Sequence, residues 1–303
     1  MDALRLVGAH LAMVLGPLVV AAAVLHQLNV VTTRVLGETF GPRAVVWFTG
    51  WLGTPVHELS HAAACVVFRH RIEELVLFRP DPATGVVGYV RYRWSPRNPW
   101  ALLGHGLVGV APLFGGAAVL VALLVALGPA GAMDRFGGAI HAHPGAFGAL
   151  VAGWVERVRS EAAILVDPRL LSQPKTWLFA YLALCVGTHL APSGVDLKGA
   201  WPSLALAVTL IGLADLTLVW WLGDAGTAWA MQAAAATIPV AAVLALAAVL
   251  VAGGLAAVLA AATVWSTVTG RGPSAPLRSA LRQPWRLTAV GAAVAAAGWL
   301  TGG

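Results

Sequence analysis

Charged residues are scarce in this sequence: Asp, Glu, Lys and Arg make up 11% of its 303 residues, whereas 59% are hydrophobic. This scarcity excludes an ordinary water-soluble domain, and the mean hydropathy of +0.80 instead indicates an integral membrane protein. Several apolar runs reach the roughly 20 residues that a helix needs to cross about 30 Å of hydrocarbon. We therefore expect a helix bundle within a lipid bilayer.

Cysteine is also scarce, and no long basic tail is present. Cys65 and Cys185 both lie in apolar stretches, which argues against a disulfide scaffold and a cysteine-based zinc site. The net charge is +6, but the basic residues lie in short loops, where they act as topology signals, and no nucleic-acid partner is expected. A small-residue cleavage site is missing from residues 1–31, so we expect a retained first helix and not a signal peptide.

The apolar runs predict an all-α polytopic membrane protein with six or seven transmembrane helices. The expected helices cover residues 5–31, 44–69, 99–127, 175–191, 197–222 and 236–268, with a shorter run at 287–300. That last run is short for a span, so both a crossing and an interfacial position stay open. When successive loops are assigned to alternate sides of the membrane, the side that holds the N-terminus carries more Arg and Lys than the other side. The N-terminus is therefore expected in the cytoplasm.

Residues 72–94 interrupt the helical pattern. An apolar stretch at 76–78 precedes the turn sequence PDPATG, and β-branched and aromatic residues follow at 86–92. This pattern predicts a small β-hairpin between the second and third helices, at the cytoplasmic face. On the opposite side, an amphipathic surface helix is expected at 147–165.

Two histidines and a glutamate break the second apolar run, in the sequence VHELSHAAA. Positions i and i+4 share a helix face, so His57 and His61 can bind one metal ion while Glu58 reaches a water bound there. In zinc proteases with this spacing, zinc lowers the pKa of water to about 7 and the glutamate is the general base. Because ionisable groups in a span are costly and usually functional, a metal site is favoured over chance.

A third metal ligand is expected from another interruption of the apolar pattern. Pro192 and Gly194 break the chain between two apolar runs and leave Asp196 near the start of the next helix. Its carboxylate can complete a His-His-Asp site, although capping a helix N-terminus is the commoner use of such an aspartate. His189 competes for the role, as a ligand, a substrate contact, a support for a ligand or a packed polar residue.

Three other residues of apolar segments have simpler interpretations. Cys65 shares a helix face with His61, but apolar packing is favoured over metal binding. Asp215 is expected to make a structural hydrogen bond, and His105 is ambiguous.

With these motifs the sequence resembles the site-2 protease family of intramembrane zinc metalloproteases. The resemblance rests on HExxH within a span, the hairpin that follows it and a later span end carrying an aspartate. It implies one zinc ion bound by His57, His61 and Asp196, with Glu58 as base and proton shuttle. It also implies hydrolysis of peptide bonds of membrane protein or peptide substrates, within or beside the bilayer.

The resemblance covers about residues 44–222 and departs from the family in two places. Ser60 stands where the family often has glycine, and the family's Leu-Asp-Gly reads Val-Asp-Leu at 195–197. We accordingly divide the chain into an additional N-terminal transmembrane helix and loop (1–43), a metalloprotease-like membrane core (44–222) and C-terminal transmembrane helices (223–303).

Two other functions stay open from the sequence. A membrane transporter or channel could bind a translocated ion with the same His, Glu and Asp residues, although the sequence has no inverted repeat. An inactive protease-like protein could keep the metal and bind membrane partners, although the intact Glu58 argues for activity.

Overall fold

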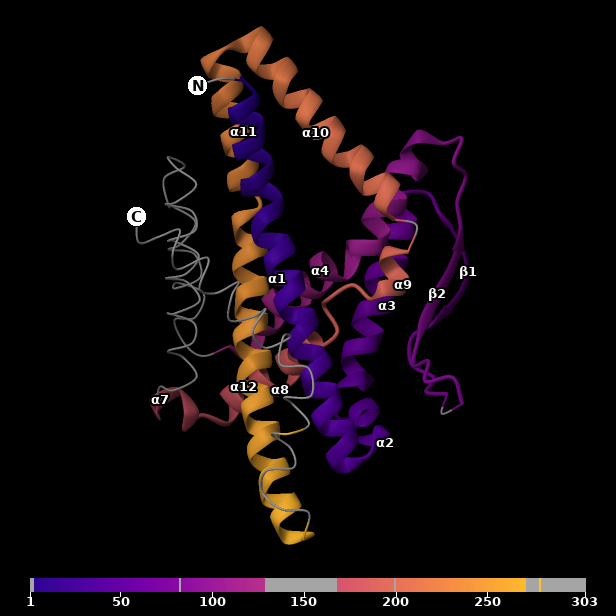
Figure 1. The fold of residues 1–303 in the computed structure, drawn as a ribbon, viewed down its shortest axis with the longest axis vertical. Coiled ribbons are helices and arrows are strands. Elements are labelled where there is room, and N and C mark those ends of the chain that lie inside the picture. Colours follow the sequence, from indigo (N-terminus) through magenta and orange to yellow (C-terminus); the bar gives the residue numbers. More distant parts are fainter. Residues whose placement is uncertain (1–2, 82, 129–167, 199, 271–277, 279–303) are drawn as a thin grey trace.

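The computed structural model describes residues 3–81, 83–128, 168–198, 200–270 and 278. Within these ranges the chain is mostly helical and contains a two-stranded antiparallel sheet (Figure 1). This confirms the predicted combination of a helix bundle with a small hairpin. The surface helix expected at 147–165 and the run at 287–300 lie outside the described residues.

The helical elements differ widely in length, from single turns to long rods. In chain order they are α1 Ala3–Phe40, α2 Pro42–Val45, the π-helical turn η1 Val46–Gly50, α3 Trp51–Val67, α4 Pro99–Leu127, α7 Pro168–Leu171, α8 Pro174–Gly187, α9 Gly194–Leu197, α10 Trp201–Leu222, α11 Asp224–Ala235 and α12 Ile238–Val268. In the described part of the chain, four segments are long and apolar enough to cross a membrane: His10–Phe40, Pro99–Leu127, Trp201–Leu222 and Pro239–Val268. This is compatible with the expected membrane protein.

The first helix is longer than the apolar run that predicted it, since α1 continues to Phe40 instead of ending near residue 31. Its extension is polar at Thr32 and Thr33, but their hydroxyls donate to the carbonyls of Leu28 and Asn29 within the helix. These bonds satisfy the two hydroxyls without help from water. Polar threonines are therefore accommodated in an otherwise apolar helix.

The helix predicted at 197–222 begins later in the structure and is preceded by a separate helical turn. The single turn of α9 comes first, and α10 begins at Trp201, with Pro202 in its first turn, where a proline costs no hydrogen bond. After α10, the sequence analysis missed α11, because Gly, Thr and Gln interrupt its apolar residues. The separate turn α9 matters for the site, because α9 carries Asp196.

The long helices α1 and α12 lie side by side over much of the molecule (Figure 1). Their contact is part of an apolar core that includes Leu25, Val31, Leu244 and Val251, all fully buried. Helices α4 and α8 pack against α12, and α3 packs against α4 and α8. The helix with the HExxH sequence is thus held between two others.

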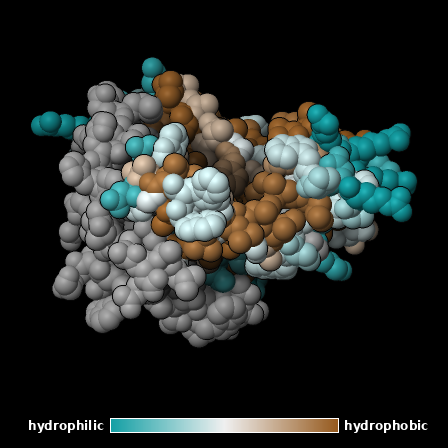
Figure 2. Space-filling view, turned by 90° about the horizontal axis from the view of Figure 1, so that it is seen from above, coloured by the Kyte–Doolittle hydropathy of each residue, from teal (hydrophilic) through white to brown (hydrophobic). Residues whose placement is uncertain are grey.

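The predicted hairpin consists of β1, Arg71–Val76, and β2, Tyr89–Arg93, which pair in antiparallel fashion. The sheet ends earlier than expected, since residues 86–88 lie outside β2, but the two arms stay joined: the Arg79 amide donates to the Val87 carbonyl at 2.7 Å. The hairpin lies alongside α3 (Figure 1). Hydrophilic side chains gather at this end of the molecule, whereas hydrophobic side chains dominate the middle of the face shown (Figure 2).

Candidate metal centre

Helix α3 presents both histidines of the HExxH sequence on one face, as the spacing predicts. The Nε2 atoms of His57 and His61 lie 3.1 Å apart. The other ring nitrogen, Nδ1, lies 2.6 Å from the His189 carbonyl oxygen for His57 and 2.7 Å from the Val108 carbonyl oxygen for His61. Because a carbonyl oxygen only accepts, each Nδ1 carries the hydrogen, and both Nε2 atoms offer a lone pair to the same place.

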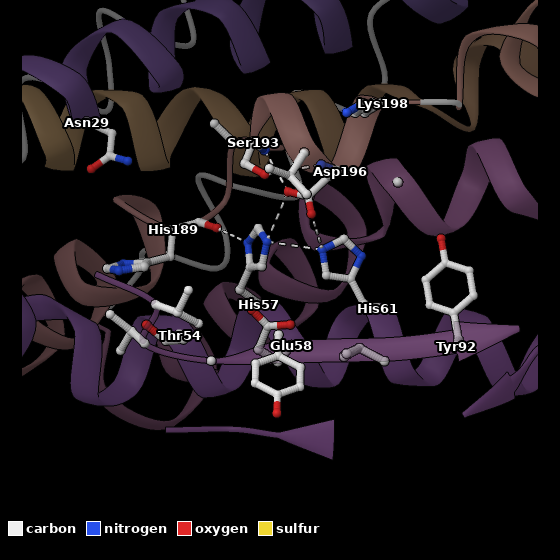
Figure 3. Close-up of a pocket in the computed structure, with 18 residues that line it drawn as sticks. Asn29, Thr54, His57, Glu58, His61, Tyr92, His189, Ser193, Asp196 and Lys198 are labelled. Atoms are coloured by element: carbon white, nitrogen blue, oxygen red, sulfur yellow. Dashed lines mark hydrogen bonds and ion pairs between the residues drawn. The ribbon is translucent and has the colours of Figure 1, made fainter. Parts of the chain in front are cut away.

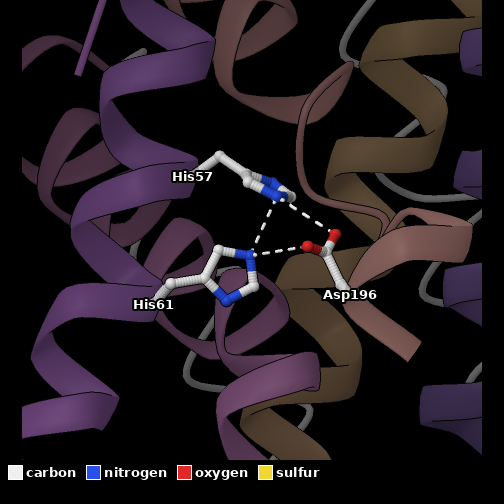
Figure 4. A group of neighbouring side chains, drawn as sticks. All are labelled: His57, His61 and Asp196. Carbon is white, nitrogen blue, oxygen red and sulfur yellow. Dashed lines mark hydrogen bonds and ion pairs between the residues drawn. The ribbon is translucent and has the colours of Figure 1, made fainter. Parts of the chain in front are cut away.

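Asp196 reaches the two histidines from the single turn of α9 (Figure 4). Its Oδ1 lies 3.2 Å from Nε2 of His61, and its Oδ2 lies 3.3 Å from Nε2 of His57. The carboxylate also accepts from the Ser193 amide at 2.6 Å, while the Ser193 hydroxyl accepts from the Asp196 amide at 3.2 Å, which forms a capping box. The predicted cap is present, and the same carboxylate faces the two histidines, as a metal ligand would.

The three side chains form a group that can hold a metal ion. Two lone pairs that face each other across 3.1 Å repel unless a cation lies between them. With zinc bonds of about 2.0–2.1 Å, neighbouring ligand atoms of a tetrahedral site lie about 3.3–3.4 Å apart. The separations of 3.1, 3.2 and 3.3 Å come close to that geometry, and the donor set of two imidazoles and a carboxylate suits zinc.

Glu58 lies beside this group and is 8% exposed. Among the described residues, its carboxylate makes no hydrogen bond and no ion pair. Buried carboxylates are costly and are normally paired, so an unpaired one at a candidate metal site marks a functional position. Figure 3 shows Glu58 next to His57 at the cavity that the three possible ligands line.

This cavity has a volume of about 600 Å³, within the range of ligand-binding sites in proteins. One wall is α3, with His57, His61 and Glu58, and another is the hairpin arm at 86–92. The segment around α9, Gly109 of α4 and Asn29 of α1 complete the lining (Figure 3). The HExxH residues and Asp196, distant in sequence, therefore share one chamber with the hairpin.

Close packing between helices brings the metal group together. A Cβ atom added at Gly109 of α4 would lie 2.5 Å from the Asp196 carbonyl oxygen. One added at Gly53 of α3 would overlap both the Cys185 carbonyl oxygen and Nδ1 of His189. Neither position has room for a side chain, so glycine at both lets α3, α4 and the chain after α8 approach as closely as the site requires.

His189 lies next to the group without joining it. Its backbone carbonyl orients His57, whereas its own Nδ1 lies 3.1 Å from the Cys185 carbonyl oxygen. Of the roles considered for it, the structure places it as a support for a ligand, through its backbone. Cys65 is fully buried and is not part of the metal group, as expected.

Asp215 and His105 lie outside the cavity lining and have other partners. Asp215 makes the expected buried hydrogen bond, to Nδ1 of His10 at 2.5 Å. His105 stacks on Trp94, with ring centroids 4.5 Å apart, and its Nδ1 lies 3.4 Å from the Tyr92 hydroxyl. His105 therefore belongs to an aromatic cluster beside the hairpin.

The sequence analysis missed Asn29, Tyr92 and the Val108 carbonyl. A carboxamide inside the first apolar run was a signal that could have singled out Asn29. No sequence signal points to a backbone carbonyl such as that of Val108.

The fold and the site together define a helical protein with several possible membrane spans and a partly buried His-His-Asp group able to hold a metal ion. No family model, no curated protein and no solved structure matches this chain.

Proposed function

We propose that this protein is an intramembrane zinc metalloendopeptidase that hydrolyses peptide bonds of membrane protein or peptide substrates within or beside the bilayer. The observation that carries the proposal is the position of Glu58. Its buried carboxylate, unpaired among the described residues, lies beside two imidazoles and a carboxylate that converge on one point. This is the arrangement that the resemblance to site-2 proteases implied.

The residues have distinct tasks in this proposal. Zinc held by His57, His61 and Asp196 would lower the pKa of water and polarise the scissile carbonyl. Glu58, whose lone pairs are not engaged by any of the described residues, takes the proton of the attacking water and delivers it to the leaving amine nitrogen. The carbonyls of His189 and Val108 keep the imidazoles in the orientation that this requires.

The hairpin offers a means of holding an unwound substrate. A membrane helix has its backbone groups paired internally, so a scissile bond becomes accessible only when a segment is extended. Val87 lines the cavity, and its amide N–H makes no hydrogen bond with the described residues, while β2 is paired only with β1 in the described sheet. An extended substrate can add to this arm as a further strand.

The membrane arrangement proposed here has six or seven crossings, with the N-terminus in the cytoplasm. Helical elements follow one another without a break over residues 42–67, which is long enough for a crossing in addition to the four long apolar segments. The helix α8 would supply another. Reporter fusions placed after α1, α3 and α4 test the alternation of sides.

Removal and return of metal test the function itself. Purified protein is treated with a chelator, dialysed and supplied again with zinc, and cleavage of membrane-spanning peptides is followed by mass spectrometry. We expect cleavage to disappear with the metal and to return with about one equivalent of zinc. A protein that retains metal but cleaves no peptide, and that carries ions across vesicles, would instead be a transporter.

A further inference from the structure

In the part of the chain that the structure describes, the polar side chain of Asn29 has no partner. It lies on α1 and lines the cavity that holds the metal group and Glu58 (Figure 3). Among the described residues, its buried Oδ1 has no hydrogen-bond partner, and no hydrogen bond is made by its Nδ2 either. The backbone carbonyl of Asn29 is by contrast engaged, by the hydroxyl of Thr33.

An unpaired carboxamide is unfavourable in this setting. Asn29 lies within the segment His10–Phe40, one of those apolar enough to cross a membrane, and little water is available there to replace a missing partner. Proteins rarely retain such a group unless a ligand supplies the missing hydrogen-bond partners. The cavity supplies the place from which a ligand could approach.

A carboxamide matches the peptide group in its hydrogen bonding. It offers one acceptor and an N–H donor side by side, and a peptide group offers one N–H and one carbonyl. The substrate segment in the cavity has lost its helical hydrogen bonds and so presents these groups unpaired.

We infer that Asn29 binds the backbone of the unwound substrate, its Oδ1 accepting from a substrate N–H and its Nδ2 donating to a substrate carbonyl. The inference rests on the proposed function, because the ligand is the peptide substrate of the same site. It makes α1 a part of the substrate-binding site, although the resemblance to site-2 proteases does not extend to residues 1–43. Asn29 is a positioning residue: it holds the substrate, whereas Glu58 takes part in the reaction.

Binding of an uncleaved peptide tests this inference. In the full chain with Glu58→Gln, which prevents turnover, the affinity for a fluorescent membrane-spanning peptide is compared with that of the double variant carrying Asn29→Leu. Loss of the paired amide is expected to weaken binding about tenfold. The matched control is Thr32→Val, because that hydroxyl bonds only its own helix, at 2.8 Å to Leu28, and does not line the cavity; it should change affinity less than about twofold.

Ester substitution in the peptide identifies the bond. In a series of peptides, one amide N–H at a time is replaced by an ester oxygen, which should weaken binding to the protein that retains Asn29. At one position in the peptide, the same replacement should leave the affinity for the Asn29→Leu protein unchanged. Equal affinity of the two proteins, the same ester losses in both, or no peptide binding by either would overturn the inference. Zinc-dependent cleavage by the wild type, measured separately, decides the proposed function independently of these results.

Discussion

The carbonyl oxygen of Val108 on α4 lies 2.7 Å from Nδ1 of His61 on α3. This bond fixes the ring so that Nε2 faces Asp196, and the His189 carbonyl fixes His57 in the same way. Both supports come from the backbone of neighbouring segments. The orientation of the two imidazoles is thus tied to the packing of α3 against α4 and the chain after α8.

Asp196→Asn should separate the two roles of Asp196. The Asn side chain retains an oxygen that can accept from the Ser193 amide, so the cap and the thermal stability should be largely preserved. The charge and one strong ligand atom are lost, and zinc affinity should fall by about 100-fold or more. Zinc titration beside thermal unfolding checks both effects, and unchanged zinc affinity would show that Asp196 is only a cap.

Gly109→Ala should disturb the metal group without touching any ligand side chain. The new methyl group would press on the Asp196 carbonyl, 2.5 Å away, and overpacking of this kind costs about 1–3 kcal/mol. We expect about tenfold weaker zinc binding, measured by competition with a chelating dye. Gly212→Ala is the control, because its added methyl group meets Val7 at an ordinary 3.6 Å; equal effects of the two would refute the proposed contact.

Val87→Pro should reduce cleavage while zinc stays bound. The free N–H of Val87 disappears, but the Val87 carbonyl that accepts from Arg79 remains. Val87→Ala keeps the N–H and is the matched control. A peptide-cleavage assay should show about a tenfold loss for proline and little for alanine. Unchanged cleavage with proline would remove the strand-addition step.

Tyr92, in the hairpin beside the cavity, should lose its phenolic proton at a higher pH than an ordinary tyrosine. Burial raises the pKa of its hydroxyl to about 12, from an ordinary value near 10. A raised pKa means that the folded protein holds the proton more tightly, so this contribution to stability is complete below pH of about 10 and is lost as the pH rises toward 12. Ultraviolet titration of the wild type minus Tyr92→Phe should reveal one phenolate forming near pH 12, whereas ionisation near 10 would contradict the burial.

The sequence was most informative where spacing alone determines geometry. The interval from His57 to His61 placed two imidazoles on one helix face, and the break at Pro192 and Gly194 pointed to Asp196. Hydropathy predicted apolar segments that could span a membrane, and turn residues predicted the hairpin. All of these features are local, because they depend on residues close together in the chain.

What the sequence could not supply depends on tertiary packing. The carbonyl of Val108 has no sequence signal, and Gly109 differs from other glycines only through the backbone that lies against it. Asn29 gains its significance from a cavity built by segments more than a hundred residues apart. The separate turn of α9 was likewise hidden, because Pro192 and Gly194 were interpreted as a break between two helices.

The most direct test of the central claim compares the wild type with Glu58→Gln on the same membrane-spanning peptide, with zinc content measured in each. Glu38→Gln, outside the cavity, is the control for the loss of a carboxylate. We predict that all three proteins bind about one equivalent of zinc and that only Glu58→Gln loses cleavage, by about 100-fold or more. Equal cleavage by the wild type and Glu58→Gln, or a zinc-bound wild type that cleaves nothing, would contradict the account.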